Sequence, residues 1–133
     1  MIAIDTNIVV RLVTNDDPQQ ARRAATLFES RSVFIPKTVL LESEWVLRHA
    51  YAVPRNAISI ALRGVLGLPG TSVEDPAALA LALEWFDGGM DFADALHLAS
   101  SQQVDVFATF DTKLIARARG LGPVVVVAPG ENQ

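Results

Sequence analysis

The chain opens with Met1-Ile-Ala-Ile-Asp5-Thr6-Asn7, in which three apolar residues run into an acid and two polar residues. An apolar run without polar alternation is typical of a strand buried on both faces of a parallel sheet. We therefore expect this strand in the middle of the sheet, with Asp5 at its carboxyl end, where α/β proteins place ligands and chemistry. The alternative is that Asp5 only caps the helix that follows.

Strand and helix patterns alternate along the rest of the chain. Further short strands are expected at residues 33–35, 71–73, 104–109 and 124–127. Helices are expected at residues 6–13, 18–30, 37–51, 54–66, 76–87, 91–103 and 111–119. Asp17 and Pro18 have the residue types of an N-cap and a first helical position. This alternation predicts an α/β protein, a three-layer α/β/α fold with a central parallel sheet, as a single domain over residues 1–133.

The composition excludes several classes of protein. There is no cysteine, so disulfides, thiolate metal sites and thiol nucleophiles are absent. Half of the 133 residues are apolar, which suggests that a partner or a second copy covers some apolar surface. The N-terminus has no signal-peptide pattern and no apolar run is long enough to span a bilayer, so a cytoplasmic protein is expected.

The charges are unevenly distributed along the chain. The net charge of −4 argues mildly against a protein that coats nucleic acid. Residues 1–63 hold eight Lys or Arg against six acids, and residues 64–133 hold three against nine, so the halves carry +2 and −6. Some of these acids fall at positions that surface solubility does not explain.

Glu42 is one acid at a position where a surface charge is not expected. Its neighbours at helical spacing include Val39, Trp45 and Val46, so it is predicted to face the core, where an unpaired carboxylate is costly. Either Glu42 meets a metal or hydrogen-bond donors at the edge of the core, or the predicted facing is wrong by one residue. Glu44, with Arg48 four residues on, is interpreted as an ordinary surface pair.

Three further acids stand at predicted helix starts. Asp91 is expected to cap a helix, with Asp94 in its first turn. Small apolar residues after Asp94 suggest that it points along a buried seam, which favours a functional role. His97 is more typical of a structural or surface histidine. Asp111 follows an apolar strand as Asp5 does, and its alternative role is again a helix cap.

Taken together, these acids predict a metal site. If Asp5, Glu42, Asp94 and Asp111 converge, each pair at ~5 Å repels by roughly 3 kcal/mol at an effective dielectric of about 20. A divalent cation offsets that repulsion, and oxygen ligands without His or Cys select Mg²⁺ or Mn²⁺. Such a site suits phosphodiester hydrolysis by a water whose pKa the metal lowers.

The same motifs resemble a known family. Ile-Asp5-Thr6-Asn7, Glu42-Ser-Glu-Trp-Val-Leu, Asp91-Phe-Ala-Asp94 and Thr109-Phe-Asp111 are similar, in order and spacing, to PIN-domain ribonucleases, most closely the VapC toxins of bacterial toxin–antitoxin pairs. The resemblance covers nearly the whole chain. It implies a Mg²⁺-dependent endoribonuclease, a hydrolase that cuts structured RNA such as transfer RNA.

The resemblance also implies roles for particular residues and partners. Asp5, Glu42, Asp94 and Asp111 match the acidic quartet of the family, of which the fourth acid is the most variable. Thr6, Asn7 and Thr109 match polar residues that order the site, and Asp91 is either a supporting group or only a cap. A homodimer and a small antitoxin protein are the expected partners. RNA would need a local basic patch, and the candidates are Arg22, Arg23, Lys37 and Arg48.

Three functions are therefore weighed. In the favoured mechanism, Asp5 and Asp94 hold a Mg²⁺ (or Mn²⁺), while Glu42 and Asp111 complete its water shell. A phosphatase with Asp5 as nucleophile usually needs a second acid two residues on, where this chain has Asn7. A binding module that kept the fold without catalysis is the third possibility.

Overall fold

The computed structural model describes residues 1–130 and divides the chain into two compact units. The first unit is Met1–Pro76 and the second is Ala77–Gln133. The single domain expected over residues 1–133 stays a prediction, and its last three residues lie outside the described part of the chain.

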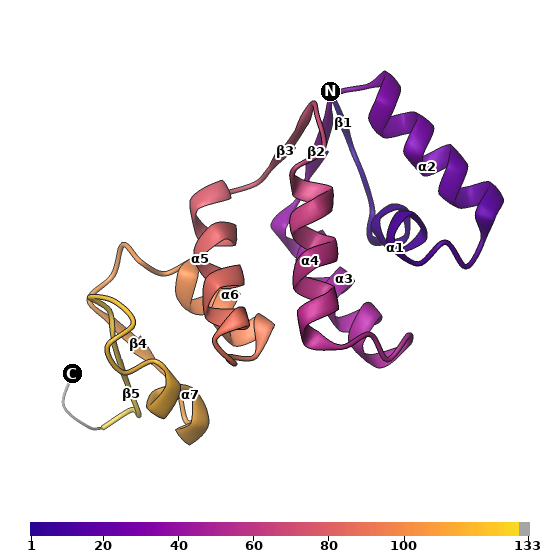
Figure 1. Ribbon diagram of the computed structural model, residues 1–133. Helices are drawn as coiled ribbons and strands as arrows, with labels where there is room; N and C mark the ends of the chain where they lie inside the picture. Colours follow the sequence, from indigo (N-terminus) through magenta and orange to yellow (C-terminus); the bar gives the residue numbers. More distant parts are fainter. Residues whose placement is uncertain (131–133) are drawn as a thin grey trace. The chain divides into compact units, whose positions relative to one another are not determined.

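The first unit is a three-stranded parallel sheet with four helices (Figure 1). Its elements follow one another as β1 (Ile2–Ala3), α1 (Thr6–Thr14), α2 (Pro18–Ser30), β2 (Val33–Ile35), α3 (Lys37–His49), α4 (Arg55–Leu66) and β3 (Thr71–Val73). The strand order is β1-β2-β3, with Ile2 opposite Val33 and Phe34 opposite Ser72. The strands end together, so the residues after them share one edge of the sheet.

Within the three-stranded sheet of the first unit, β1 is an edge strand. Within the first unit, β2 lies between β1 and β3, and β2 alone has fully buried residues, Val33 and Ile35. Ile4 is buried, whereas Ala3 is exposed, so the run is not covered on both faces. Ile2 is half-buried, so within this unit only part of the apolar run is covered, and the place of β1 in the middle of a larger sheet stays a prediction.

Helix boundaries follow local chemistry where the chain supplies it. Asp17 caps α2, because its side chain accepts a hydrogen bond from Gln20 N at 3.1 Å, and Pro18 is the first helical residue, both as predicted. The third helix ends at His49, two residues earlier than expected. The buried apolar side chains of the first unit come from the sheet and from one face of each helix. This core is Ile4, Val9, Val10, Ala21, Ala24, Phe28, Val33, Ile35, Val39, Leu40, Leu47, Ile58, Leu62 and Val65.

The second unit contains three helices and a two-stranded parallel sheet. Its elements are α5 (Pro76–Asp87), which begins at the boundary, α6 (Phe92–Ala99), β4 (Val106–Ala108), α7 (Thr112–Arg117) and β5 (Val125–Val127). Phe107 lies opposite Val126 in the sheet. The rings of Phe86 and Phe92 pack edge to face at 5.4 Å between centroids, which joins α5 to α6.

The sixth helix is shorter than the sequence predicted. It was expected to reach Gln103 but ends at Ala99. Side chains just after the helix donate hydrogen bonds to its last carbonyl oxygens. Ser101 Oγ donates to His97 O at 2.8 Å, and Gln102 Nε2 donates to Leu98 O at 3.0 Å. Such side-chain bonds to the backbone compete with further helical turns, so the chain leaves the helix here.

Gly89 occupies a backbone conformation that other residues rarely adopt. Its φ is +109°, and a Cβ placed there would lie 2.7 Å from Nη1 of Arg117. The arginine can move away, but the backbone strain remains. We therefore expect Gly89→Ala to lower the free energy of unfolding by about 1–3 kcal/mol, measured by denaturant titration. Gly88→Ala is the matched control, since its Cβ would meet only ordinary contacts, and a loss there as large as at Gly89 would contradict this account.

None of the helices in the described residues is both long and apolar enough to cross a membrane. All strand pairs are parallel, and one or two helices separate each strand from the next along the chain. The α/β class predicted from the sequence is confirmed.

Candidate active site

The first unit brings Asp5, Thr6 and Glu42 together. Asp5 follows Ile4, whose amide N donates to Phe34 O, so the carboxylate stands just beyond the end of β1. Asp5 also caps α1, because its Oδ1 accepts from Thr6 N at 2.7 Å. The buried Thr6 donates its hydroxyl to Oε1 of Glu42 on α3. This hydrogen bond fixes the carboxylate of Glu42 beside the start of α1.

The facing of α3 differs from the prediction. Glu42 is exposed and Trp45 is 56% exposed, whereas Glu44, interpreted from sequence as a surface acid, is 1% exposed. The pairing of Glu44 with Arg48 was right: Arg48 Nε lies 2.7 Å from Glu44 Oε2. The apolar face predicted for α3 differs by one residue from the face that is buried, and Val39 is compatible with both. Glu42 meets a hydrogen-bond donor at the edge of the core, which was one of the two alternatives.

The second unit brings Asp91, Asp94 and Asp111 into electrostatic contact. Burial raises the pKa of Asp94, the carboxylates of Asp91 and Asp111 raise this pKa further, and His97 acts in the opposite direction. Asp91 caps α6, since its Oδ2 accepts from Asp94 N at 3.2 Å. Asp94 is half-buried and His97 is exposed, in keeping with their expected positions.

Asp111 is held at the start of α7. Its Oδ1 accepts from Lys113 N at 2.9 Å and from Leu114 N at 3.2 Å, so the predicted alternative of a helix cap is correct. Thr109 Oγ1 in turn accepts from Asp111 N at 3.0 Å. Capping fixes Asp111 but uses only one oxygen, so the same carboxylate remains able to bind a cation.

The donor chemistry of the four candidate acids fits a hard divalent cation. Asp5, Glu42 and Asp111 each keep one carboxylate oxygen without a hydrogen bond from residues 1–130, and Asp94 keeps both. Among those same residues, no group of three or more His, Asp or Glu could hold a metal ion. Each unit by itself supplies two of the four acids. Carboxylate oxygens are the donors that Mg²⁺ or Mn²⁺ would require, and a bound cation would offset the neighbouring negative charge that, together with burial, raises the pKa of Asp94.

The raised pKa of Asp94 predicts a pH-dependent stability. A folded-state pKa above the unfolded value of 3.8 means that the folded protein binds this proton more tightly. The stabilisation is therefore present below that value and is lost as the pH rises through the folded pKa. In EDTA at pH 7 we expect Asp94→Asn to melt at a higher temperature than the parent protein, with the difference shrinking toward pH 3. A carboxyl NMR titration of Asp94 with a midpoint below 3.8 would contradict this.

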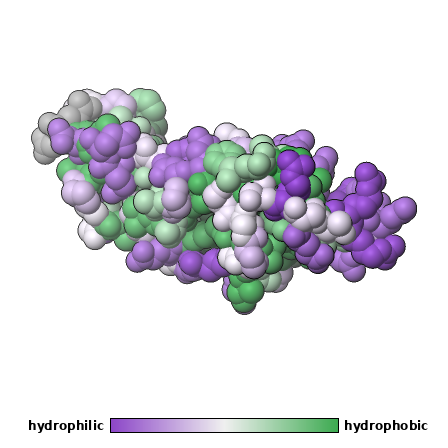
Figure 2. All heavy atoms as spheres, turned by 90° about the horizontal axis from the view of Figure 1, so that it is seen from above, coloured by the Kyte–Doolittle hydropathy of each residue, from purple (hydrophilic) through white to green (hydrophobic). Residues whose placement is uncertain are grey.

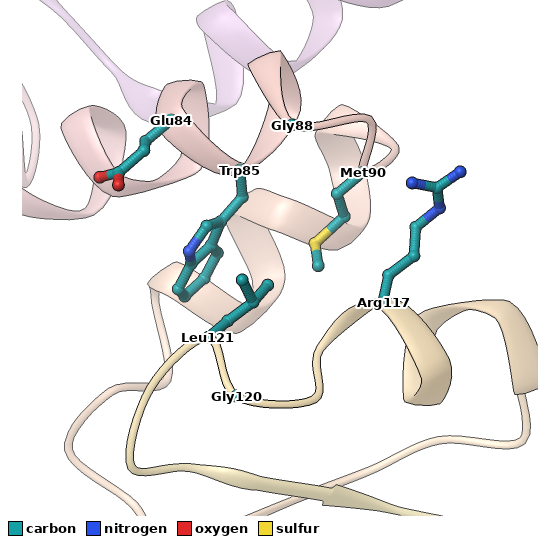
Figure 3. A pocket seen from close by; sticks show the side chains of 7 residues that line it. All are labelled: Glu84, Trp85, Gly88, Met90, Arg117, Gly120 and Leu121. Atoms are coloured by element: carbon teal, nitrogen blue, oxygen red, sulfur yellow. The ribbon is translucent and has the colours of Figure 1, made fainter.

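The second unit also contains a cavity of about 470 Å³ that is separate from these acids. Figure 3 shows Trp85, Met90 and Leu121 at this cavity, with Arg117 extending from α7 at its rim. Its remaining lining residues are Glu84, Gly88 and Gly120. Because none of the candidate acids lines it, this cavity is not part of the candidate active site.

The fold and these side chains define a class of protein: an α/β domain whose parallel strands and helix starts present carboxylates. The family model for the PIN domain matches residues 2–121, so the chain belongs to the PIN domain family. The match confirms the three-layer α/β/α fold class. A search of curated proteins finds no match. The PIN domain is generally a nuclease fold whose members typically use divalent metal ions, and membership supports a metal-dependent nuclease.

The sequence left Asp91 as either a supporting group or only a helix cap, and the structure shows that it caps a helix. Asp91 caps α6 and its charge also raises the pKa of Asp94. The spacing of three residues at a helix start was the signal, since it places the two carboxylates on neighbouring turns. Sequence reasoning missed the burial of Glu44 entirely.

Proposed function

We propose that this protein is a Mg²⁺-dependent endoribonuclease, the toxin component of a type II toxin–antitoxin pair of the VapC kind. The observation that supports it best is the PIN-domain match over residues 2–121, and the acids around Asp94, whose pKa burial and two further carboxylates raise, agree with it. The PIN domain is generally a nuclease fold, and the motifs around Asp5 and Glu42 resemble those of the VapC toxins. The proposed substrate is structured RNA, with transfer RNA as the first choice.

In this proposal Asp5 and Asp94 hold the metal ion, and Glu42 and Asp111 bind the water molecules around it. When bound, Mg²⁺ supplies charge for the phosphate and lowers the pKa of an attacking water. Thr6 orients Glu42 through its hydroxyl, and Thr109 orients the backbone of Asp111. Asn7 is exposed in the first turn of α1 and is proposed as a further polar group of the site.

The proposed partners follow from the same assignment. A cognate antitoxin protein would cover the active-site groove, and a second copy of the chain would form a homodimer in the cytoplasm. Exposed apolar side chains on α3 and α4 support a protein partner, since Trp45 is 56% and Ile60 70% exposed. Size-exclusion chromatography with light scattering tests the dimer.

Two other functions remain as alternatives. A phosphatase using Asp5 as nucleophile is weakened by the exposed amide of Asn7 at the position where a second acid would protonate the leaving group. A binding module without catalysis is favoured by no particular observation, because all four acids keep open oxygens.

The deciding experiment is cleavage of bulk transfer RNA by the purified protein, freed of any antitoxin. We expect defined fragments with Mg²⁺ or Mn²⁺ and none with EDTA. Release of phosphate from p-nitrophenyl phosphate without RNA cleavage would favour the phosphatase. Neither activity, together with no binding of divalent ions by calorimetry, would favour the binding module.

A further inference from the structure

The first unit carries a groove along its first two helices. The helices α1 and α2 pack against each other; a cavity of about 370 Å³ is lined by both helices, and a shallower one of about 680 Å³ is lined by α2 alone. Both cavities are lined by Arg23 and Leu27, so they join into one surface, which we term the α1–α2 groove. The groove is lined by Asn7, Ile8, Arg11, Gln19, Gln20, Arg22, Arg23, Ala24, Thr26, Leu27 and Ser30.

The groove is positively charged and contains no acid. Of its three arginines, Arg11 is committed within the protein: Nη1 lies 3.3 Å from Asp16 Oδ1, and Nε donates to Gln20 Oε1 at 2.8 Å. Arg22 and Arg23 are exposed and form no ion pair with any of residues 1–130. No acid lies three or four residues from either of them on α2. Two uncompensated cations therefore stand side by side in sequence at this groove.

The other basic residues considered from the sequence are already paired. Arg48 binds the buried carboxylate of Glu44. Lys37 Nζ lies 3.3 Å from Asp75 Oδ2, and the amide N of Lys37 donates to Glu74. Of the four candidates for RNA binding, only Arg22 and Arg23 keep their charge available.

The remaining lining suits a polynucleotide chain. Amide and hydroxyl side chains of Gln19, Thr26 and Ser30 offer hydrogen bonds, while Ile8 and Leu27 offer apolar contacts. Hydrophilic side chains gather on the part of the first unit where α2 lies (Figure 2). At its other end the groove includes Asn7, two residues from Asp5.

We propose that the α1–α2 groove binds the sugar–phosphate backbone of the RNA next to the bond that is cut, with Arg22 and Arg23 each contacting one phosphate. This rests on the proposed ribonuclease function. Guanidinium groups bind phosphate oxygens with two parallel hydrogen bonds, and phosphate contacts fix the register of a nucleic acid on a protein. The groove thereby guides one strand toward Asp5.

The test is the salt dependence of RNA binding in EDTA, where no cutting occurs. Fluorescence anisotropy with a labelled single-stranded RNA oligonucleotide would be measured between roughly 0.05 and 0.3 M KCl, where the Debye length falls from about 14 to about 6 Å. Two lost phosphate contacts should lower the slope of log K against log salt by about 1.4 in the Arg22→Ala/Arg23→Ala variant. If the two proteins bind equally at about 1 M salt, this slope difference makes the variant bind about 25-fold more weakly than the parent at about 0.1 M.

Two further variants make the result specific. Arg22→Lys/Arg23→Lys keeps both charges and should recover most of the slope, whereas Arg119→Ala removes one exposed charge outside the groove and should leave the slope unchanged. An unchanged slope in the double alanine variant overturns the proposal, and so does an equal effect of Arg119→Ala. Loss of binding to an oligoglutamate peptide alone, with RNA binding intact, would assign the groove to an acidic peptide instead.

The same experiment separates this inference from the proposed function. If the parent protein cuts RNA with Mg²⁺ but the double variant keeps its slope, the groove is wrong and the nuclease stands. If the slope falls as expected but no RNA is cut with any divalent ion, RNA binding by the groove stands and the proposed nuclease is wrong.

Discussion

Asp5→Asn should reduce RNA cleavage by about 10³-fold or more while leaving the fold intact. Replacing a carboxylate by an amide removes a charged metal ligand, and several kcal/mol of transition-state stabilisation correspond to that factor. Asparagine caps helices as well as aspartate does, so the hydrogen bond from Thr6 N that begins α1 can persist. The measurements are the initial rate of transfer RNA cleavage with Mg²⁺, circular dichroism and growth inhibition on expression.

Asp17→Asn is the matched control for this prediction. Asp17 is likewise an N-cap, at the start of α2, where it accepts from Gln20 N at 3.1 Å, but it belongs to no candidate site. The chemical change and the structural role are the same in both variants, so only the metal site distinguishes them. The assignment of Asp5 as a metal ligand is contradicted if Asp5→Asn cleaves RNA within about tenfold of the Asp17→Asn rate. It is also contradicted if Asp5→Asn remains toxic in cells.

The elements that sequence predicted well are those that neighbouring residues determine. The start of α2 was correct because Asp17 and Pro18 act within one turn. The end of α6 was wrong because Ser101 and Gln102 bond back to carbonyl oxygens, an outcome that composition does not distinguish from a further turn. Local capping chemistry is visible in sequence, whereas competition between side chain and helix depends on geometry.

The candidate site shows the same division. Asp5 and Asp111 were found from their positions after apolar strands, and both also cap helices, so the two interpretations were never exclusive. The hydrogen bond from Thr6 to Glu42 joins residues 36 positions apart, and helical spacing alone could not reveal it. The choice among the basic residues depended on finding the partners of Lys37 and Arg48 in space.

Arg48→Met should cost about 3 kcal/mol of folding free energy, although Arg48 lies outside the candidate site. Glu44 is 1% exposed, and Arg48 donates to both its oxygens, at 2.7 Å from Nε and 3.2 Å from Nη2. Methionine keeps the packing of the arginine stem but leaves a buried carboxylate without its cation, which costs 3–5 kcal/mol in general. We expect the lower end, since the Arg48 side chain is 36% exposed and water can reach the pair.

The control variants separate a lost ion pair from a lost side chain. Arg22→Met removes an exposed arginine without an ion partner in the described residues and should change stability by less than about 0.5 kcal/mol. Glu44→Leu combined with Arg48→Met removes both charges, and it should recover most of the loss because the buried carboxylate is gone. Urea titration measures all three variants. If Arg48→Met alone costs less than about 1 kcal/mol, Glu44 does not depend on this cation, and Arg48 becomes available again as a ligand for RNA.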